Sequence, residues 1–424
     1  MADALILPIG LVTAGLVAAR LGVLTIAAWQ QAAYRREQDQ LTLEVMRERI
    51  AEAKKRRNEN SLAWNGYRKF VVHRKVVEAE GVCSFYLVAH DHKSLPVYKP
   101  GQYLTFRLSI PGRDKPVIRC YSLSDCPRSD HYRVSIKRVG SPPDAPSAPP
   151  GLVSNYFHEQ VTEGDILDVQ APRGHFFLET EHERPAVLIA GGVGVTPLLS
   201  MVNSIVAARS QREVFFFYGV RNGREHAFRE VLNRVVAQHP NIRLVVAYSR
   251  PNQEDEKQEG RDYHHVGRVD VQLIKSYLQA TNYQFYLCGP PTMMETLNKQ
   301  LTRWGVAEQD IHSEAFGPAT VSKAFTPPQA VAGGVSDQAS TTTITFAKSG
   351  KTCVWKNAAG NLLDLAEANG VRIDSGCRAG NCGTCVVAVK SGQIQYVTEH
   401  GAELEEGTCL TCIAAPQGNV VLDA

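Results

Sequence analysis

The first hydrophobic segment of the chain is a long apolar stretch close to its N-terminus. It runs from Leu5 to Trp29 (LILPIGLVTAGLVAARLGVLTIAAW), and Arg20 is the single charge inside it. A helix of about 25 residues is about 37 Å long, whereas the hydrocarbon core of a bilayer is roughly 30 Å thick. Arg20 is costly in hydrocarbon, but its long side chain can reach toward an interface. We therefore expect residues 1–33 to form a membrane anchor.

The residues after this stretch predict its orientation. Trp29 and Tyr34 suit the headgroup region, and arginines follow at positions 35, 36, 47 and 49. By the positive-inside rule, the rest of the chain then faces the cytoplasm, on a single-pass anchor in the lipid of the inner (cytoplasmic) membrane. One alternative is a cleaved signal peptide, which would need a positive charge before the apolar run. Another is a helix on a surface or inside protein, which Arg20 favours.

The next segment, residues 34–65, is highly charged and rich in helix-forming residues (RREQDQLTLEVMRERIAEAKKRRNEN). This composition favours a solvated helical stalk between the anchor and the remaining domains. A short coiled-coil contact through Leu41, Val45 and Ile50 is the alternative.

From residue 66 to residue 177, apolar and polar positions alternate and turn residues separate the runs. Examples are FVVHRKVVEAEGVCSFYLVAH and YLTFRLSI. A period of two between turns is typical of antiparallel strands, and we expect an antiparallel β-barrel. The tract SPPDAPSAPPG at 141–151 is predicted to be a loop at its rim.

The pattern changes again after residue 184. Short apolar runs such as AVLIAGG, VFFFYGV and FYLCGPP alternate with helical stretches up to residue 317, which predicts a parallel α/β sheet. Residues 318–340 are rich in Ala, Gly, Ser and Pro and are predicted to be an interdomain linker. Residues 341–424 begin with two strand-like segments, and a helix and a cysteine-rich loop follow. The chain is therefore multidomain.

Composition narrows the function mainly through cysteine. The net charge of +3 on 424 residues gives no reason to expect a nucleic acid as partner. Five of the ten cysteines lie in the last fifty residues. This clustering in a long chain indicates a metal centre in a reducing compartment, not a disulfide scaffold.

The cysteine loop has the spacing of a plant-type [2Fe–2S] site, namely Cys377-x4-Cys382-x2-Cys385 followed by Cys412. Glycines at 376, 380 and 383 allow the backbone to wrap a cluster and to point N–H groups at its sulfurs. A structural zinc site is the alternative, but its paired C-x2-C knuckles would leave Cys377 unused. The last eighty residues or so resemble plant-type ferredoxins. The resemblance implies a β-grasp-like fold, makes Cys412 the fourth ligand, and leaves Cys353 and Cys409 as buried or spectator thiols.

A candidate flavin site begins in the segment VIRCYSLSD, which carries Arg119, Tyr121 and Ser122. An arginine there can neutralise a phosphate, an aromatic two residues later faces the same side of the strand, and a hydroxyl can bond to a flavin ring nitrogen. The alternative is a strand with a surface arginine. The next strand carries Lys137, and Gly151 and Ser154 then open a helical turn that suits a diphosphate.

Taken together, residues 66–316 resemble the ferredoxin–NADP reductase superfamily. The resemblance implies that FAD, in preference to FMN, is bound by Arg119, Tyr121 and Ser122, with Tyr121 stacked on the ring. It also implies that Ser154 contacts the diphosphate, and we include Lys137 and Gly151 in the cofactor site.

The candidate nicotinamide site centres on GGVGVTP, in which Gly192 and Gly194 precede Thr196 between a buried strand and a helix. Glycines there allow a diphosphate to approach the helix N-terminus closely. The same resemblance places Thr196 near the nicotinamide and the flavin. It makes Cys288, Gly289 and Pro290 the opposite wall, with Cys288 positioning the hydride donor; a buried inert cysteine is the alternative. The catalytic candidates are therefore Tyr121, Ser122, Thr196 and Cys288.

Two further details of the nucleotide half carry predictions. In the segment SEAFGP, Glu314 and Phe316 match a terminal acidic-aromatic segment, which implies that both lie close to the flavin; a phenylalanine that packs on the strands is the alternative. A 2′-phosphate needs a basic or hydroxyl group at the adenosine end, and Arg250 or Arg221 can supply it. We therefore expect NADPH more than NADH, although Arg250 facing solvent is the alternative.

The implied order is flavin domain, nucleotide domain and ferredoxin domain. Dioxygenase-type reductases have this order but lack an anchor, and respiratory sodium-pump subunits have an anchor but place the ferredoxin first. We expect an NAD(P)H-dependent reductase that passes electrons through FAD and a [2Fe–2S] cluster to a separate protein acceptor, such as an oxygenase or desaturase. The alternative is an electron-input subunit of a larger membrane redox complex.

Overall fold

The structure is a computed structural model that falls into two units, Met1–Ala63 and Trp64–Ala424. It describes scattered positions before residue 64, and then residues 64–424 except 115, 142–145, 148, 181, 258, 316–341, 356–359, 377, 379, 381–382, 398–401 and 403. Most of the predicted anchor at 1–33, much of the predicted stalk and all of the predicted linker at 318–340 therefore lie outside the described residues. Within the described part of the chain, no helix has both the length and the apolar character that a membrane span requires.

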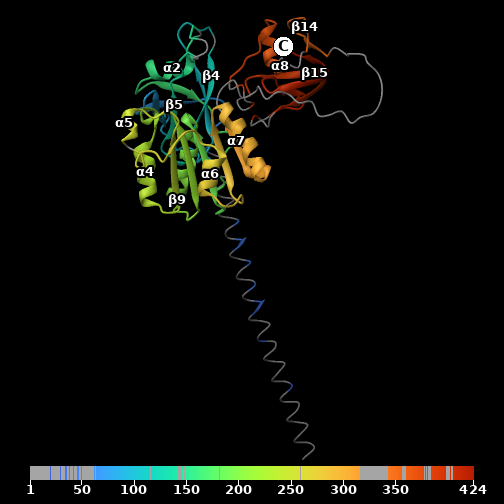
Figure 1. Ribbon diagram of the computed structural model, residues 1–424. Coiled ribbons are helices and arrows are strands. Elements are labelled where there is room, and N and C mark those ends of the chain that lie inside the picture. Colours follow the sequence, from blue (N-terminus) through green and yellow to red (C-terminus); the bar gives the residue numbers. More distant parts are fainter. Residues whose placement is uncertain are drawn as a thin grey trace, which may run out of the picture. The chain divides into compact units, whose positions relative to one another are not determined.

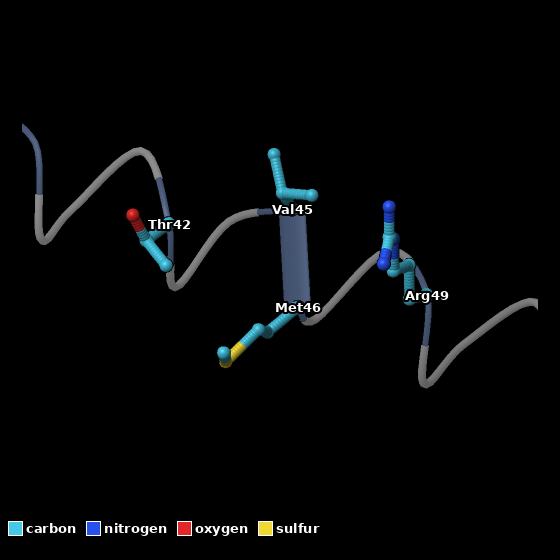
Figure 2. Close-up of a pocket in the computed structure, with 4 residues that line it drawn as sticks. All are labelled: Thr42, Val45, Met46 and Arg49. Carbon is cyan, nitrogen blue, oxygen red and sulfur yellow. The ribbon is translucent and has the colours of Figure 1, made fainter.

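The described positions of the first unit are helical. Figure 2 shows Thr42, Val45, Met46 and Arg49 on successive turns of this segment. The Thr42 hydroxyl donates to the Gln38 carbonyl at 2.8 Å, four residues back, as a threonine on a helix can. These positions agree with the helical character predicted for residues 34–65.

The first sheet of the second unit is antiparallel and has the strand order β4-β3-β6-β1-β2-β5. Its strands are β1 (Arg68–Ala79), β2 (Val82–Ala89), β3 (Tyr103–Leu108), β4 (Val117–Ser122), β5 (Tyr132–Lys137) and β6 (Ile166–Val169). Just beyond β4, an antiparallel bridge between Leu123 and Val134 joins the two edge strands. This bridge closes the sheet, so the predicted antiparallel β-barrel is confirmed.

The interior of the barrel is aromatic and aliphatic. Phe70, Phe85 and Phe106 are fully buried in it, and helix α2 (Leu152–Glu159) contributes Phe157. The rings of Phe85 and Phe106 meet Phe157 edge to face, with centroids 5.1 and 5.5 Å apart. This packing fixes α2 over one end of the barrel.

The second sheet is parallel, with the order β10-β9-β8-β7-β11-β12. The strands are β7 (Ala186–Gly191), β8 (Val214–Val220), β9 (Ile242–Tyr248), β10 (His265–Val266), β11 (Gln284–Gly289) and β12 (Ile311–Ala315). Helices connect them, as Figure 1 shows: α3 (Val195–Ala207), α4 (Arg229–Gln238), α5 (Gln253–Glu256), α6 (Val271–Tyr277) and α7 (Pro291–Trp304). The predicted parallel α/β sheet is confirmed.

Alternate residues of the central strands enter two separate cores. Leu188 and Phe216 pack on one face of the sheet, and Val187 and Phe215 pack on the other. Because both faces are covered, these strands are apolar at nearly every position. Strand order reverses between β7 and β11, and such a switch point leaves a crevice beyond the carboxyl ends of the strands.

The third sheet is mixed, with the order β14-β13-β17-β15-β16. Its strands are β13 (Thr343–Phe346), β14 (Lys351–Val354), β15 (Val386–Tyr396), β16 (Thr408–Leu410) and β17 (Ala414–Leu422). Strands β13 and β17 are parallel and the other pairs are antiparallel, and helix α8 (Leu362–Ala368) packs its leucines into the same core. This arrangement fits the β-grasp-like domain that we expected.

Candidate active site

The predicted flavin residues lie together at the end of β4. The Tyr121 ring meets Phe106 and Phe157 edge to face, with centroids 5.9 and 5.4 Å apart, so it sits between the barrel and α2. Arg119 is exposed, and Ser122 is buried. An exposed guanidinium beside a half-buried aromatic ring and a buried hydroxyl is a chemical set that fits a flavin with its phosphates.

The start of α2 is built differently from the prediction for Ser154. The Ser154 hydroxyl donates to the Gly151 carbonyl at 3.0 Å and accepts from the Val139 N–H at 3.1 Å. A Cβ on Gly151 would lie 2.8 Å from the Val139 Cβ, so glycine is required for this close packing. Ser154 thus stabilises the helix start in this structure, and its contact with a diphosphate stays a prediction.

Lys137, which we assigned to the cofactor, pairs with the nucleotide domain instead. Its Nζ lies 2.6 Å from Glu225 Oε2, and the same carboxylate accepts from Arg221 at 3.1 Å. A lysine engaged in a short ion pair has less capacity for a phosphate. Sequence alone gave no signal for this pairing, because the two partners are 88 residues apart.

The nicotinamide candidates meet at the carboxyl ends of β7 and β11. The turn Gly192–Gly194 lies so close to β11 that a Cβ on Gly194 would overlap the Cys288 carbonyl. Gly192 has φ +55° and open space around its Cα, which leaves room above the turn. Thr196 is buried and its hydroxyl donates to the Val193 carbonyl at 3.0 Å. Pro290 precedes α7 directly after Gly289.

A carboxyl group completes this site: it is that of Glu314, which the resemblance placed near the flavin together with Phe316 but which was not among our catalytic candidates. Glu314 on β12 faces Cys288 in the β11–β12 ladder and accepts a hydrogen bond from Ser122 at 3.5 Å. Burial raises the pKa of the Glu314 carboxyl to about 8, and the hydrogen bond from Ser122 opposes that rise. Near neutral pH this group therefore holds a proton between the flavin strand and the nucleotide sheet. Burial also raises the pKa of the Cys288 thiol, which keeps it protonated.

The adenosine end of the nucleotide site is predicted at the ends of β8 and β9. The Arg250 N–H donates to the Arg221 carbonyl at 2.8 Å, so the two arginines lie on adjacent loops. A surface hollow beside them is lined by Asn222, Arg224, Asn252, Gln253 and Glu254. The predicted flavin contact Phe316 lies outside the described residues.

Two of the four predicted cluster ligands lie in the described part of the third domain. Cys385 and Cys412 are both buried and belong to one small apolar cluster with Leu363, Ala402, Leu410 and Ile413. Thr411 holds the two segments together, because its hydroxyl and its N–H both donate to the Cys385 carbonyl, at 3.0 and 3.2 Å. Cys377 and Cys382 lie outside the described residues.

The loop between these ligands turns through left-handed residues. Gly380 and Gly383 have φ angles of +74° and +72°, and Arg378 has φ +54°. Cys409 packs elsewhere, in the core with Ile344 and Leu365. Two buried thiols at the base of such a loop fit a [2Fe–2S] cluster, and Cys409 belongs to a different apolar cluster. Among the described residues alone, no three His, Cys, Asp or Glu converge on a metal position.

Three segments of the chain match known domain families, in the same order as the three sheets. Residues 69–178 match the oxidoreductase FAD-binding domain, residues 188–299 the oxidoreductase NAD-binding domain, and residues 345–417 the 2Fe-2S iron-sulfur cluster binding domain. The chain is therefore an NAD(P)H-dependent flavin and iron–sulfur oxidoreductase with FAD and a [2Fe–2S] cluster.

Some similar proteins match only the FAD-binding and NAD-binding domains, and others match all three domains. A flavohemoprotein of Halalkalibacterium halodurans is 42% identical over 261 residues, which are 60% of this chain and 61% of that protein. The chain thus spans about three fifths of the length of such relatives.

Two solved structures complete the comparison. The FAD/NAD-binding domain of a nitric oxide dioxygenase from Vibrio cholerae O1 biovar El Tor has a TM-score of 0.53 at 36% identity, covering 60% of this chain and all of that one. Phthalate dioxygenase reductase has a TM-score of 0.50 at 22% identity and covers 85% of this chain and 98% of its own. This likeness shows that the fold is shared.

Proposed function

We propose that this reductase delivers its electrons to a separate one-electron acceptor protein, such as an oxygenase or desaturase. The observation that carries the proposal is the order of domains, with a cluster domain after a flavin–nucleotide pair that already forms a complete hydride-accepting module. Phthalate dioxygenase reductase, a modular structure for electron transfer from pyridine nucleotides to [2Fe-2S], shares this fold over 85% of the chain. Bound flavin accepts two electrons as hydride and the cluster passes them on singly.

The chain's own residues have defined tasks in this proposal. Arg119 neutralises flavin phosphate, and Tyr121 covers the ring. Ser122 and the neutral Glu314 present hydroxyl groups where the flavin and the nicotinamide meet. The turn at Gly192–Gly194 admits the nucleotide diphosphate against β11, and Cys385 and Cys412 hold the cluster with Cys377 and Cys382.

The proposed function is tested by reduction of an external one-electron acceptor. The purified full chain is mixed with NADH or NADPH and with cytochrome c, and flavin reduction is followed separately by its absorbance. We expect Cys412→Ala to keep flavin reduction and to lose most cytochrome c reduction. Equal cytochrome c reduction by the wild type and Cys412→Ala would show that electrons leave from the flavin, which would contradict the proposal.

The N-terminal segment places this activity at the inner membrane in our proposal, because the apolar run Leu5–Trp29 is long enough to cross a bilayer. Removing residues 1–33 is expected to move the protein from the membrane fraction to the soluble fraction with its flavin retained. A chain that is already soluble at full length would contradict the anchor. Purification in mild detergent distinguishes the acceptor models, since a stable multi-subunit complex would favour the electron-input subunit over the free reductase.

For the nicotinamide, we propose NADPH, because Arg221 and Arg250 lie on adjacent loops at the adenosine end of the sheet. Arg250→Ala is expected to lower kcat/KM for NADPH about tenfold and to leave NADH unchanged, since a 2′-phosphate contact is charge-assisted. Arg243→Ala is the matched control, because this exposed arginine lies at the start of β9, over the Phe215 ring, whereas Arg250 follows the end of that strand. An equal effect of Arg250→Ala on both nucleotides would contradict the assignment.

A further inference from the structure

A carboxylate just beyond the flavin strand contacts the helix that follows the nicotinamide turn. Asp125 lies three residues after Ser122 in the sequence, and both its backbone and its side chain bond to α3. Its carbonyl accepts from the Ser200 hydroxyl at 2.6 Å, and its Oδ1 accepts from Asn203 Nδ2 at 3.0 Å. Ser200 and Asn203 are three residues apart and therefore share one face of the helix.

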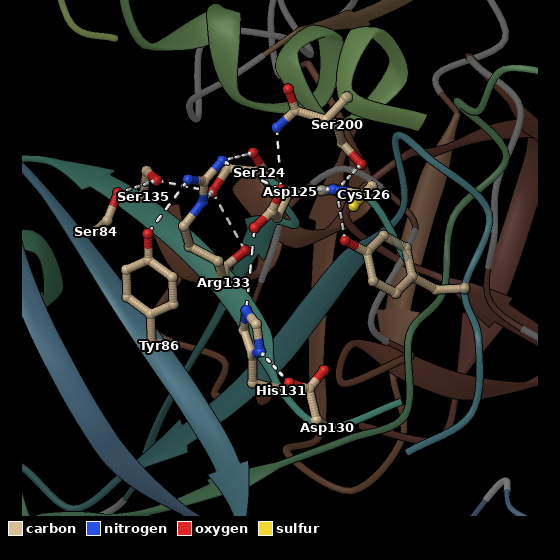
Figure 3. Close-up of polar contacts among 12 residues, drawn as sticks. Ser84, Tyr86, Ser124, Asp125, Cys126, Asp130, His131, Arg133, Ser135 and Ser200 are labelled. Carbon is tan, nitrogen blue, oxygen red and sulfur yellow. Dashed lines mark hydrogen bonds and ion pairs between the residues drawn. The ribbon is translucent and has the colours of Figure 1, made fainter. Parts of the chain in front are cut away.

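The barrel holds the same aspartate from its own side. The Tyr98 hydroxyl donates to the Asp125 carbonyl at 2.6 Å, and Asp125 Oδ1 lies 3.9 Å from the Arg133 guanidinium. The imidazole of His131 is 4.0 Å from Oδ2. Figure 3 shows Arg133, on β5, and His131, directly before that strand, pointing toward Asp125. Asp125 is thus bonded on both sides of the junction between the two domains.

Arg133 extends the junction to a second point on the nucleotide domain. It is almost fully buried, donates to the Ser124 hydroxyl at 3.1 Å and to the Ser124 carbonyl, and its guanidinium lies 5.6 Å from the centre of the Phe228 ring, directly before α4. A buried guanidinium needs an anion, and Asp125 is the carboxylate within ion-pair distance of it in the described structure. The negative charge of Asp125 therefore stabilises Arg133 in its position beside Phe228, and the same carboxylate accepts the hydrogen bond from Asn203.

The contacts on α3 lie one to two turns from the nicotinamide turn. Thr196 is in the first turn of the helix, and Ser200 and Asn203 follow one and two turns later on the helix. Because a helix moves as a rigid body, a shift at Asn203 is transmitted to Thr196 and to Gly192–Gly194. On the other side, the chain from Asp125 back to Ser122 is short and closed by the Leu123–Val134 bridge.

From this geometry we infer that Asp125 is a positioning residue for hydride transfer, which fixes the nicotinamide turn relative to the flavin strand. The inference rests on hydride transfer from NAD(P)H to the flavin, and it adds that one junction between the domains sets the distance for that step. The rate of such a transfer falls steeply as the reacting groups move apart, and a misplacement of about 1 Å can lower it roughly 100-fold.

Stopped-flow flavin reduction by NADH and NADPH tests the inference in the full chain. Asp125→Ala is expected to lower the limiting rate constant by about 10- to 100-fold, with the nucleotide Kd changed less than about threefold. The long-wavelength charge-transfer absorbance between nicotinamide and flavin is expected to weaken in parallel. Unchanged rate and absorbance in Asp125→Ala would overturn the inference, whereas a wild type that NAD(P)H does not reduce would overturn the underlying function.

Asp168→Ala is the matched control for stability. Asp168 is also a barrel carboxylate paired with an arginine, Arg107, at 2.9 Å, and the contacts described for it stay within the barrel. It is expected to lower the melting temperature without changing the limiting rate. If Asp168→Ala slowed flavin reduction as much as Asp125→Ala, general destabilisation of the barrel would explain both and the inference would fail.

Asn203→Ala tests the same contact from the nucleotide domain and keeps the Asp125–Arg133 pair. It is expected to lower the limiting rate in the same direction, and the double variant with Asp125→Ala is expected to be no slower than Asp125→Ala alone. Residues that act through one contact give such non-additive effects. Fully additive losses would show that the two residues act separately and would contradict the inference, even where one single variant folds poorly.

Discussion

The Ser122 hydroxyl donates a hydrogen bond to Glu314 Oε2 at 3.5 Å and so joins the end of the flavin strand to the last strand of the nucleotide sheet. The carboxyl belongs to one domain and the hydroxyl to the other. Because burial keeps Glu314 neutral near pH 7, the contact is made without burying a net charge. A neutral acid at this position can donate as well as accept a hydrogen bond.

The first prediction concerns the pH dependence of flavin reduction. The pKa of Glu314 is about 8, well above that of a free carboxyl, so the group is protonated below that pH and charged above it. We expect the rate constant for flavin reduction to fall as pH rises through about 8, and Glu314→Gln, which stays neutral, to lack this fall. Stopped-flow measurements from pH 6 to 10 check this. Glu179→Gln, a change at an exposed carboxyl, serves as the control, and an identical fall in Glu314→Gln would refute the assignment.

The second prediction concerns the close contact of the nicotinamide turn with β11. A methyl group on Gly194 would overlap the Cys288 carbonyl, and backbone on both sides cannot move away cheaply. Gly194→Ala is expected to destabilise the protein by about 1–3 kcal/mol and to slow flavin reduction by NAD(P)H. Gly140→Ala is the control, since open space surrounds that position. The melting temperatures and flavin reduction rates of Gly194→Ala and Gly140→Ala are compared. Equal values in the two variants would contradict the packing argument.

The third prediction separates the two cysteines of the segment CLTC. Cys412 shares a small cluster with Cys385, whereas Cys409 packs into the main core of the domain. Cys412→Ala is expected to lose the electron paramagnetic resonance signal of the reduced [2Fe–2S] cluster, and Cys409→Ala to keep it at a lower melting temperature. Loss of the signal in Cys409→Ala with retention in Cys412→Ala would reverse the ligand assignment.

The fourth prediction concerns acid stability. His226 is buried, its Nδ1 lies 2.9 Å from the Tyr248 hydroxyl, and burial lowers its pKa to about 4. Its contribution to stability is therefore fully present above the pKa of a free histidine, about 6.5, and is lost as pH falls from there toward 4.

Between pH 7 and pH 5 this histidine accounts for a loss of roughly 2 kcal/mol in the free energy of unfolding. Denaturant titrations at the two pH values measure the loss. We expect it to be smaller in His226→Gln than in wild type and unchanged in His182→Gln, which alters a largely exposed side chain. A wild-type loss that persists in His226→Gln would show that other groups control acid stability.

The sequence predicted the elements well where periodicity is local, and missed contacts made over long separations. Alternation marked the barrel strands, and uninterrupted apolar runs such as that of β8 marked the parallel sheet, because each pattern reflects which faces are buried. Spacing singled out Cys385, and the resemblance to plant-type ferredoxins chose Cys412 as the fourth ligand. The pairing of Lys137 with Glu225 and the contacts of Asp125 with α3 join residues more than seventy positions apart, and no local pattern encodes them.

Candidate ligand-binding residues were easier to propose from the sequence than the residues that join the two domains. Arg119, Gly194 and Cys288 belong to short motifs because a phosphate or a nicotinamide imposes a fixed local chemistry. Asn203 and Phe228 have ordinary surroundings in the sequence, since the domain junction requires complementary shape and charge, not a motif. Ser154 was proposed as a phosphate contact, but a hydroxyl at a helix start can also bond within the protein, as that of Ser154 does with Gly151 and Val139.

The bridge between Leu123 and Val134 bears on how the chain can be altered. It closes the barrel one residue after Ser122, so strand pairing fixes the number of residues between the flavin strand and Asp125. Inserting one residue there would turn each following side chain to the opposite face of the strand and move Leu123 out of its register with Val134. A sensor domain or an affinity tag is therefore better inserted in the proline-rich tract at 141–150, which lies in the sequence between β5 and α2.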